Sequence, residues 1–205
     1  ATNFAGKEIS SSKLMDIVED SMNFEIPLKQ ITERICVLEL FHGPTLAFKD
    51  VGARVTARFM STFSPDEKIT ILVATSGDTG SAVANGFLGV KGVNVVILYP
   101  SGKVSALQEK QLTTLGHNIT ALEVDGTFDD CQRLVKQAFL DEELRSAFDL
   151  ASANSINIAR LIPQSFYYFA AYSQAKKKGL HAPVVFAVPS GNFGNLSAGL
   201  MAYKM

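Results

Sequence analysis

The sequence predicts an α/β fold with open, mostly parallel β-sheets flanked by helices. Apolar, β-branched runs of strand length alternate along most of the chain with stretches that have helical spacing. Most residues of these runs are apolar on both faces, which is typical of buried parallel strands. Glycine and proline fall at the junctions: Pro100, Ser101 and Gly102 follow one run, and Gly116 follows one helical stretch. These observations favour parallel strands joined by covering helices.

The predicted elements begin with an amphipathic helix over about residues 12–22, after a short polar lead. The strand-like runs are residues 35–40, 69–74, 93–98, 119–124 and 184–188, and the helical stretches are residues 50–62, 81–88, 104–115, 129–140 and 156–177. A last helix begins near residue 196 and reaches the final residue without a cap. We therefore expect a piece of a longer protein.

The composition is that of a globular protein with a sizeable core. Of 205 residues, 47% are apolar and 19% are charged, and the net charge is −1. This balance gives no electrostatic reason to expect nucleic acid or a membrane surface as partner, and no apolar run is as long as a membrane-spanning helix. Cys36 and Cys131 lie far apart and the histidines are scattered, so we expect free thiols, a cytoplasmic location and no metal site.

Lys49 is the first residue with a pattern that indicates chemistry. A turn at residues 43–45 leads through three apolar residues to this lysine, which lies at a predicted helix start. The helix dipole and the apolar neighbours both disfavour the ammonium form, so they lower the pKa toward the neutral amine that a Schiff base requires. The alternative is an ordinary lysine whose stem lies along an amphipathic helix.

A second polar segment, residues 75–82, lies where a predicted strand passes into a helix. Two glycines three positions apart stand there among small hydroxyl residues, and the candidate binding residues are Ser76, Asp78 and Thr79. Backbone N–H groups in such a turn can close on an anion such as a carboxylate. Any tight strand-to-helix turn has a similar composition, so a purely structural turn is the alternative.

The loop after the predicted strand 184–188 is unusually rich in glycine and asparagine. It contains Gly191, Asn192, Phe193, Gly194 and Asn195. The glycines permit positive φ and close backbone approach, and the asparagines add side-chain donors. Because a helix start follows, this loop suits a phosphate group.

A fourth candidate site lies at the start of the long helix near residue 156. Asn154 and Ser155 precede the helix, and Arg160 lies one to two turns further on. An asparagine, a serine and a planar guanidinium that converge at a helix start suit a second anion. The alternative is that Asn154 or Ser155 caps the helix and Arg160 is a surface charge.

Five segments together resemble pyridoxal-phosphate enzymes of the tryptophan-synthase-β type, called fold type II, and among these the threonine synthase family. The segments are LFHGPTLAFKD (40–50), TSGDTGSA (75–82), SGKVSALQEKQL (101–112), NSINIARLIPQ (154–164) and SGNFGN (190–195). They occur in the order of that family and are spread over residues 40–195, most of the length of the chain. Asp78 stands where serine dehydratases and cysteine synthases are expected to have asparagine.

The resemblance implies a lyase of threonine biosynthesis, acting on a carbon–oxygen bond to phosphate. O-phospho-L-homoserine and water would give L-threonine and phosphate, with pyridoxal 5'-phosphate as cofactor. Lys49 would form the Schiff base and then move protons among the substrate carbons. The cofactor phosphate would be held by Gly191, Asn192, Phe193, Gly194 and Asn195. Ser76, Asp78 and Thr79 would face the amino-acid end of the substrate or the cofactor ring, and Asn154, Ser155 and Arg160 would bind the substrate's phosphate.

The resemblance also implies a division of the chain. Residues 1–65 would carry the lysine as part of a larger cofactor domain, residues 66–165 would form a small α/β domain, and residues 166–205 would begin the rest of the larger domain. The family has a long N-terminal lead and a large C-terminal part that supplies the partner of the cofactor's pyridine nitrogen. We therefore expect these residues alone to be inactive. Ala53 departs from the family, in which a second glycine is expected there.

Two other interpretations stay open. A serine or threonine dehydratase-like enzyme of the same cofactor class would keep Lys49 and act on a different substrate. A non-catalytic phosphate-binding module, or an inactive fragment, would keep the glycine loop, and Lys49 would be unreactive. The intact segment around Lys49 argues against the phosphate-binding module.

Overall fold

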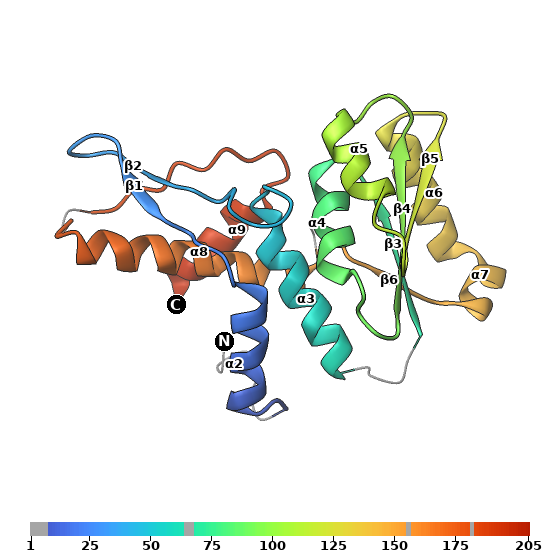
Figure 1. The fold of residues 1–205 in the computed structure, drawn as a ribbon, viewed down its shortest axis with the longest axis horizontal. Coiled ribbons are helices and arrows are strands. Elements are labelled where there is room, and N and C mark those ends of the chain that lie inside the picture. The colour runs from blue at the N-terminus through green and yellow to red at the C-terminus, as the bar shows by residue number, and fades with distance from the viewer. Residues whose placement is uncertain (1–7, 64–67, 155–156, 181–182) are drawn as a thin grey trace.

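The computed structural model describes residues 8–63, 68–154, 157–180 and 183–205. Helix α3 (Lys49–Phe63) lies between two groups of elements (Figure 1). One group is a four-stranded sheet with its covering helices. The other contains helix α2 (Ser11–Ser21), a short hairpin, and helices α8 (Ile158–Lys177) and α9 (Gly194–Lys204).

The sheet is parallel throughout and has the strand order β5-β4-β3-β6. Its strands are β3 (Ile69–Ala74), β4 (Val93–Pro100), β5 (Ile119–Val124) and β6 (Asp149–Ser152). Every residue of β3 is buried, which explains its continuous apolar run. The predicted α/β fold with a parallel sheet is confirmed. Strand β6 was not predicted, because its sequence, DLAS, is short and lacks a β-branched residue.

Helices cover both faces of this sheet. Helices α4 (Asp78–Phe87) and α5 (Ala106–Thr113) pack on one face, where Val83, Phe87 and Leu112 join the main apolar core. Helix α6 (Phe128–Leu140) packs on the other face through Cys131 and Val135. A short helix that was not predicted, α7 (Glu142–Ala147), follows α6. The chain passes from the carboxyl end of β3 through residues 75–77 directly into α4. One of the candidate sites predicted from the sequence lies at this junction.

Two predicted parallel strands are wrong. Residues 35–40 contain β2 (Cys36–Leu38), which pairs antiparallel with β1 (Leu28–Gln30) in a separate two-stranded sheet. Residues 184–188 form no strand, and Val185 is 89% exposed. A strand needs a neighbour for its backbone hydrogen bonds, and no described strand lies beside this segment.

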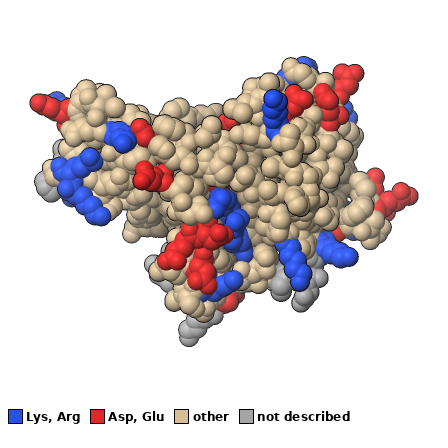
Figure 2. Space-filling model, viewed as in Figure 1, with Lys and Arg blue, Asp and Glu red and all other residues tan. Residues whose placement is uncertain are grey.

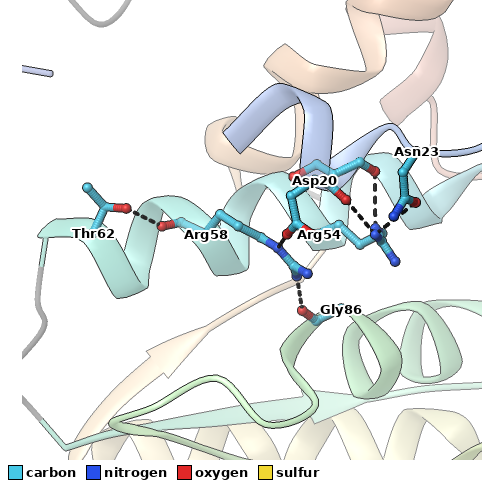
Figure 3. Close-up of polar contacts among 7 residues, drawn as sticks. Asp20, Asn23, Arg54, Arg58, Thr62 and Gly86 are labelled. Atoms are coloured by element: carbon cyan, nitrogen blue, oxygen red, sulfur yellow. Dashed lines mark hydrogen bonds and ion pairs between the residues drawn. The ribbon is translucent and has the colours of Figure 1, made fainter. Parts of the chain in front are cut away.

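Two arginines of α3 join the N-terminal helix to the sheet group (Figure 3). Arg54 donates from Nε to the carbonyl of Ser21 (3.1 Å) and so binds the C-terminal end of α2. Arg58 donates from Nε to Asp20 (2.6 Å) and from Nη1 to the carbonyl of Gly86 on α4 (2.7 Å). Helix α3 is therefore fixed to both groups.

Charged side chains lie mainly at the projecting edges and around the N-terminal helix on the face shown in Figure 2, and much of the remaining surface is uncharged. Among the described residues, no helix is both long and apolar enough to cross a membrane.

Ala53, at the position where the family is expected to have glycine, lies at the contact between helices α3 and α4. Ala53 is fully buried, and a Cβ built at Gly86 would lie 3.0 Å from the Ala53 Cβ and 3.0 Å from its carbonyl carbon. The backbones can approach because only one of the two positions carries a methyl group. Gly86 therefore accommodates the alanine.

Gly86→Ala is expected to destabilise the protein by about 1–3 kcal/mol, because the added methyl group overpacks the helix contact. Ala53→Gly in the same chain should recover only part of this loss, because it removes the contact between the two Cβ atoms and leaves the contact with the backbone of α3. The measurement is the midpoint of urea unfolding for both variants. Equal midpoints for the single and double variants would show that the two residues do not compensate.

Candidate active site around Lys49

Lys49 is the first residue of helix α3, as its sequence predicts, and its side chain is half-buried. Its Nζ donates a hydrogen bond to Oγ1 of Thr79, in the first turn of α4, at 3.0 Å. The lysine segment and the segment at residues 75–82 are therefore brought together. This contact joins two of the four sites predicted from sequence.

Asp50 holds the loop before the lysine in its bent form. Its carboxylate is 1% exposed and accepts hydrogen bonds from the backbone N–H (3.0 Å) and the hydroxyl of Thr45. A Cβ at Gly43 would collide with this carboxylate, so the turn requires glycine there. Burial raises the pKa of Asp50, and the hydrogen bonds from Thr45 oppose that rise.

Tyr167 of α8 fixes the peptide group that directly precedes Lys49. Its hydroxyl donates to the carbonyl oxygen of Phe48. Tyr167 is 4% exposed, and burial raises its pKa, so the hydroxyl keeps its proton and stays a donor. The loop that leads into the lysine is thus held by buried groups at two points, Thr45 and Phe48.

Burial is the main cause that lowers the pKa of Lys49. The attraction of Asp78 on α4 raises this pKa, and the repulsion of Arg160 on α8 lowers it. A lysine with a lowered pKa has more of the neutral amine near pH 7 than a lysine in water has. The amine is therefore suited to attack a carbonyl group.

The turn before α4 differs in one respect from its prediction. The backbone N–H groups of Gly77 (3.0 Å) and Gly80 (2.8 Å) both donate to Oγ1 of Thr75. They are engaged within the turn, so the two glycines do not offer these N–H groups to an anion. Ser76 and Asp78 are exposed at the start of the helix, and Thr79 is half-buried beside Lys49.

Arg160 is buried, which contradicts the idea of a surface charge. Its side chain is 0% exposed, and Nη1 donates to the carbonyl of Ala153 at 2.6 Å. Its Nε and Nη2 have no hydrogen-bond partner among the described residues. Burial lowers its pKa to about 10. A buried guanidinium with two unused nitrogens is a donor set for an anion, and the anion would reach it only after neighbouring side chains move.

The cap of α8 is Asn157, where Asn154 or Ser155 had been considered. Its side chain accepts from the N–H of Ala159 (3.0 Å) and donates to the carbonyl of Ser152 (3.1 Å). Asn154 is half-buried just before it. Ser155 lies outside the described residues.

The loop at residues 190–195 is held from within and by α8. The Ser190 hydroxyl donates to Oδ1 of Asn195 (2.7 Å), and Tyr168 of α8 donates from its hydroxyl to the Asn195 carbonyl (2.7 Å). The positive φ that was expected at a glycine falls at Phe193 instead (55°), immediately before α9. A left-handed non-glycine residue is strained, and such residues gather at binding sites.

Gly191 and Asn192 are exposed in this loop, as is Phe193 (61% exposed), and Gly194 begins α9. Helix α9 packs on α8, where Gly199 lies against the ring of Tyr168. Consecutive tyrosines of α8 thus hold the two segments that are candidates for the site. Tyr167 holds the lysine segment, and Tyr168 holds the glycine-rich loop.

Comparison with known proteins identifies the family. The sequence profile described as "Pyridoxal-phosphate dependent enzyme" matches residues 24–205. The chain belongs to this family. Its lysine segment and glycine-rich loop both lie within the matched residues.

Among the described residues, no group of three or more His, Cys, Asp or Glu could hold a metal ion.

Several similar members of this family are threonine synthases, so the resemblance seen in the sequence is confirmed. The threonine synthase of Serratia marcescens is 52% identical over 98% of this chain and 47% of that protein. The crystal structure of threonine synthase from Escherichia coli is 51% identical, with a TM-score of 0.87 over 98% of this chain and 47% of that chain. A structure described as PLP-bound threonine synthase from Brucella melitensis is 43% identical, with a TM-score of 0.90 over 100% of this chain and 45% of that one. The chain thus spans about half the length of the curated relatives it matches.

Tyr168→Phe is expected to weaken the binding of pyridoxal phosphate roughly 2- to 12-fold, the usual worth of one hydrogen bond. The loss of the hydroxyl leaves the Asn195 carbonyl without its donor and loosens the loop. The measurement is the dissociation constant of the cofactor for the complete natural polypeptide that includes these residues. Tyr172→Phe, on the same helix and 48% exposed, is the control and should bind normally. Equal affinities in the two variants would contradict this role of Tyr168.

Proposed function

We propose that the complete protein is a threonine synthase, which converts O-phospho-L-homoserine and water into L-threonine and phosphate. The observation that carries the proposal is the environment of Lys49. Its amine is half-buried at the start of a helix, has a lowered pKa and donates a hydrogen bond to Thr79 in the first turn of α4. The similarity to threonine synthases over nearly the whole chain supports this choice of substrate.

The residues present fit pyridoxal 5'-phosphate. Lys49 supplies the amine that would attach it, and the loop from Gly191 to Asn195 would hold its phosphate at the start of α9. When bound, the cofactor supplies the electron sink that lets protons leave substrate carbons. The free amine of Lys49 would take up and return such protons, because its pKa is lowered toward neutral pH.

The substrate would be held by two groups of side chains. We assign its amino-acid end to Ser76, Asp78 and Thr79, since these lie at the start of α4 and Thr79 touches the lysine. We assign its phosphate to Asn154, Ser155 and Arg160, because Nε and Nη2 of Arg160 have no partner among the described residues.

We further propose the division into residues 1–65, 66–165 and 166–205, of which the second boundary falls within helix α8 (Ile158–Lys177). The four-stranded sheet occupies the middle part, and the lysine helix precedes it. We place the reaction in the cytoplasm, where the two free thiols of Cys36 and Cys131 would stay reduced.

The complete natural polypeptide, loaded with pyridoxal phosphate, is expected to release phosphate and threonine from O-phospho-L-homoserine and to leave serine and threonine unchanged. Lys49→Ala should abolish turnover, because no other half-buried amine lies beside Thr79 among the described residues. The measurement is product formation from each substrate. Turnover of serine or threonine in place of phosphohomoserine would support a dehydratase and refute this proposal.

Arg160→Gln is expected to raise the KM for O-phospho-L-homoserine roughly 10- to 100-fold, the cost of one charge-assisted hydrogen bond. The variant keeps a polar side chain and loses the charge. Steady-state kinetics give KM and kcat, and thermal unfolding checks that the variant is folded. A folded variant with an unchanged KM would remove Arg160 from the substrate site.

A further inference from the structure

The segment 101–112 has no role in the site proposed above, yet one of its side chains reaches the turn beside Lys49. Gln108, in the first turn of α5, donates from Nε2 to Oδ1 of Asp78 at 2.6 Å. Helices α4 and α5 pack against each other, so this hydrogen bond joins the starts of two neighbouring helices.

Gln108 is itself fixed by the cap of α5. Its Oε1 accepts from the backbone N–H (3.3 Å) and the hydroxyl (3.1 Å) of Ser105, and the Ser105 hydroxyl oxygen accepts from the backbone N–H of Gln108 (3.3 Å). This reciprocal arrangement is a capping box. Because Oε1 is engaged on α5, the amide nitrogen is the end that faces Asp78.

The same amide lies directly on Gly77. A Cβ built at Gly77 would lie 2.5 Å from Cδ, Nε2 and Oε1 of Gln108, and Gly77 has φ of 141°. No side chain fits between them, and only glycine adopts this backbone easily. Gln108 therefore contacts the turn at two adjacent residues, through packing on Gly77 and a hydrogen bond to Asp78.

Asp78 directly precedes Thr79, whose hydroxyl accepts the hydrogen bond from Lys49, so the Asp78 charge lies near the amine. The charged groups that act on Lys49 are Asp78 on α4, which favours the ammonium form, and Arg160 on α8, which disfavours it. Asp78 is exposed, so without a contact its side chain would be free to turn into water. The hydrogen bond from Gln108 restricts that freedom.

We propose that Gln108 is a positioning residue that holds the Asp78 carboxylate where it acts on the Lys49 amine. The inference rests on the proposed function, in which Lys49 is the amine that attaches the cofactor. Gln108 acts through Asp78, and it gives the segment 101–112 a role at the site.

The test follows how attachment to Lys49 depends on pH. The complete natural polypeptide is mixed with pyridoxal phosphate at a series of pH values and reduced with borohydride, and the labelled Lys49 peptide is quantified by mass spectrometry. Gln108→Leu is expected to move the midpoint of labelling down by about 0.5–1 pH unit. The direction follows because an amine whose negative neighbour turns away gives up its proton at lower pH.

A double-mutant cycle separates this role from a merely structural one. In an Asp78→Ala background, Gln108→Leu should cause no further shift, since the carboxylate that Gln108 positions is absent. Ser105→Ala is the matched control, because it removes only the hydroxyl of the capping box; the backbone N–H at this position still binds Oε1 of Gln108, so the amide keeps its contact with Asp78. It should keep the original midpoint. If Gln108→Leu fails to fold, Gln108→Asn withdraws the amide by one methylene and should give the same shift.

An unchanged midpoint in a folded Gln108 variant would overturn the inference, and so would an equal shift in the Asp78→Ala background. In either case Lys49 would still be labelled, so the proposed function would stand. Absence of label on Lys49 in the unsubstituted protein would overturn the proposed function and the inference together.

Discussion

An amine that must lose its proton near neutral pH cannot lie in open water, and the arrangement of three helices keeps Lys49 partly out of it. Helix α3 places the lysine at its first residue, α4 supplies the Thr79 hydroxyl that binds its nitrogen, and α8 supplies the positive charge of Arg160. Burial is the largest effect on its pKa, and it depends on how closely these helices pack. Close packing is possible because small residues lie at the contacts: Gly52 faces Arg160, and Gly86 faces Ala53.

Helix α8 is the common support of the lysine segment and the glycine-rich loop. Tyr167 holds the Phe48 carbonyl, and Tyr168 holds the Asn195 carbonyl. A further hydrogen bond, from the Thr56 hydroxyl to the carbonyl of Ala159 (3.0 Å), fixes α8 to α3. A rigid helix that holds both segments keeps their separation constant, which a cofactor that spans an amine and a phosphate site requires.

Much of the fold follows from local patterns in the sequence. The strands at residues 69–74 and 119–124 have the bounds expected, because each is a mostly apolar run rich in β-branched residues that follows glycine- or charge-containing loop residues. The helix starts were also close, since Ser105 and Thr127 cap helices through their own side chains. The failures share a cause: pairing between strands is not local. The run at residues 184–188 looks like a buried strand, yet none of the described strands lies beside it.

The candidate site was predictable where a residue's role depends on its neighbours in the chain, as for Lys49. The supporting residues were not predictable. In the sequence, Tyr167 and Tyr168 lie in a mostly apolar helix and resemble ordinary core residues. Only the folded structure brings their hydroxyls to the carbonyls of Phe48 and Asn195. Gln108 lies 30 residues from Asp78 in the sequence, and no local pattern connects the two. The unused nitrogens of Arg160 likewise become visible only when its surroundings are known.

The most direct test of the account is the pKa of the Lys49 amine in the protein without cofactor. Competitive acetylation across a range of pH, with the modified peptides quantified by mass spectrometry, gives the pKa of that single side chain. We predict a pKa for Lys49 below the ordinary lysine value of about 10.4, and a lower value still when Asp78 is replaced by alanine. A pKa at or above the ordinary value would contradict the central claim that burial prepares this amine for chemistry.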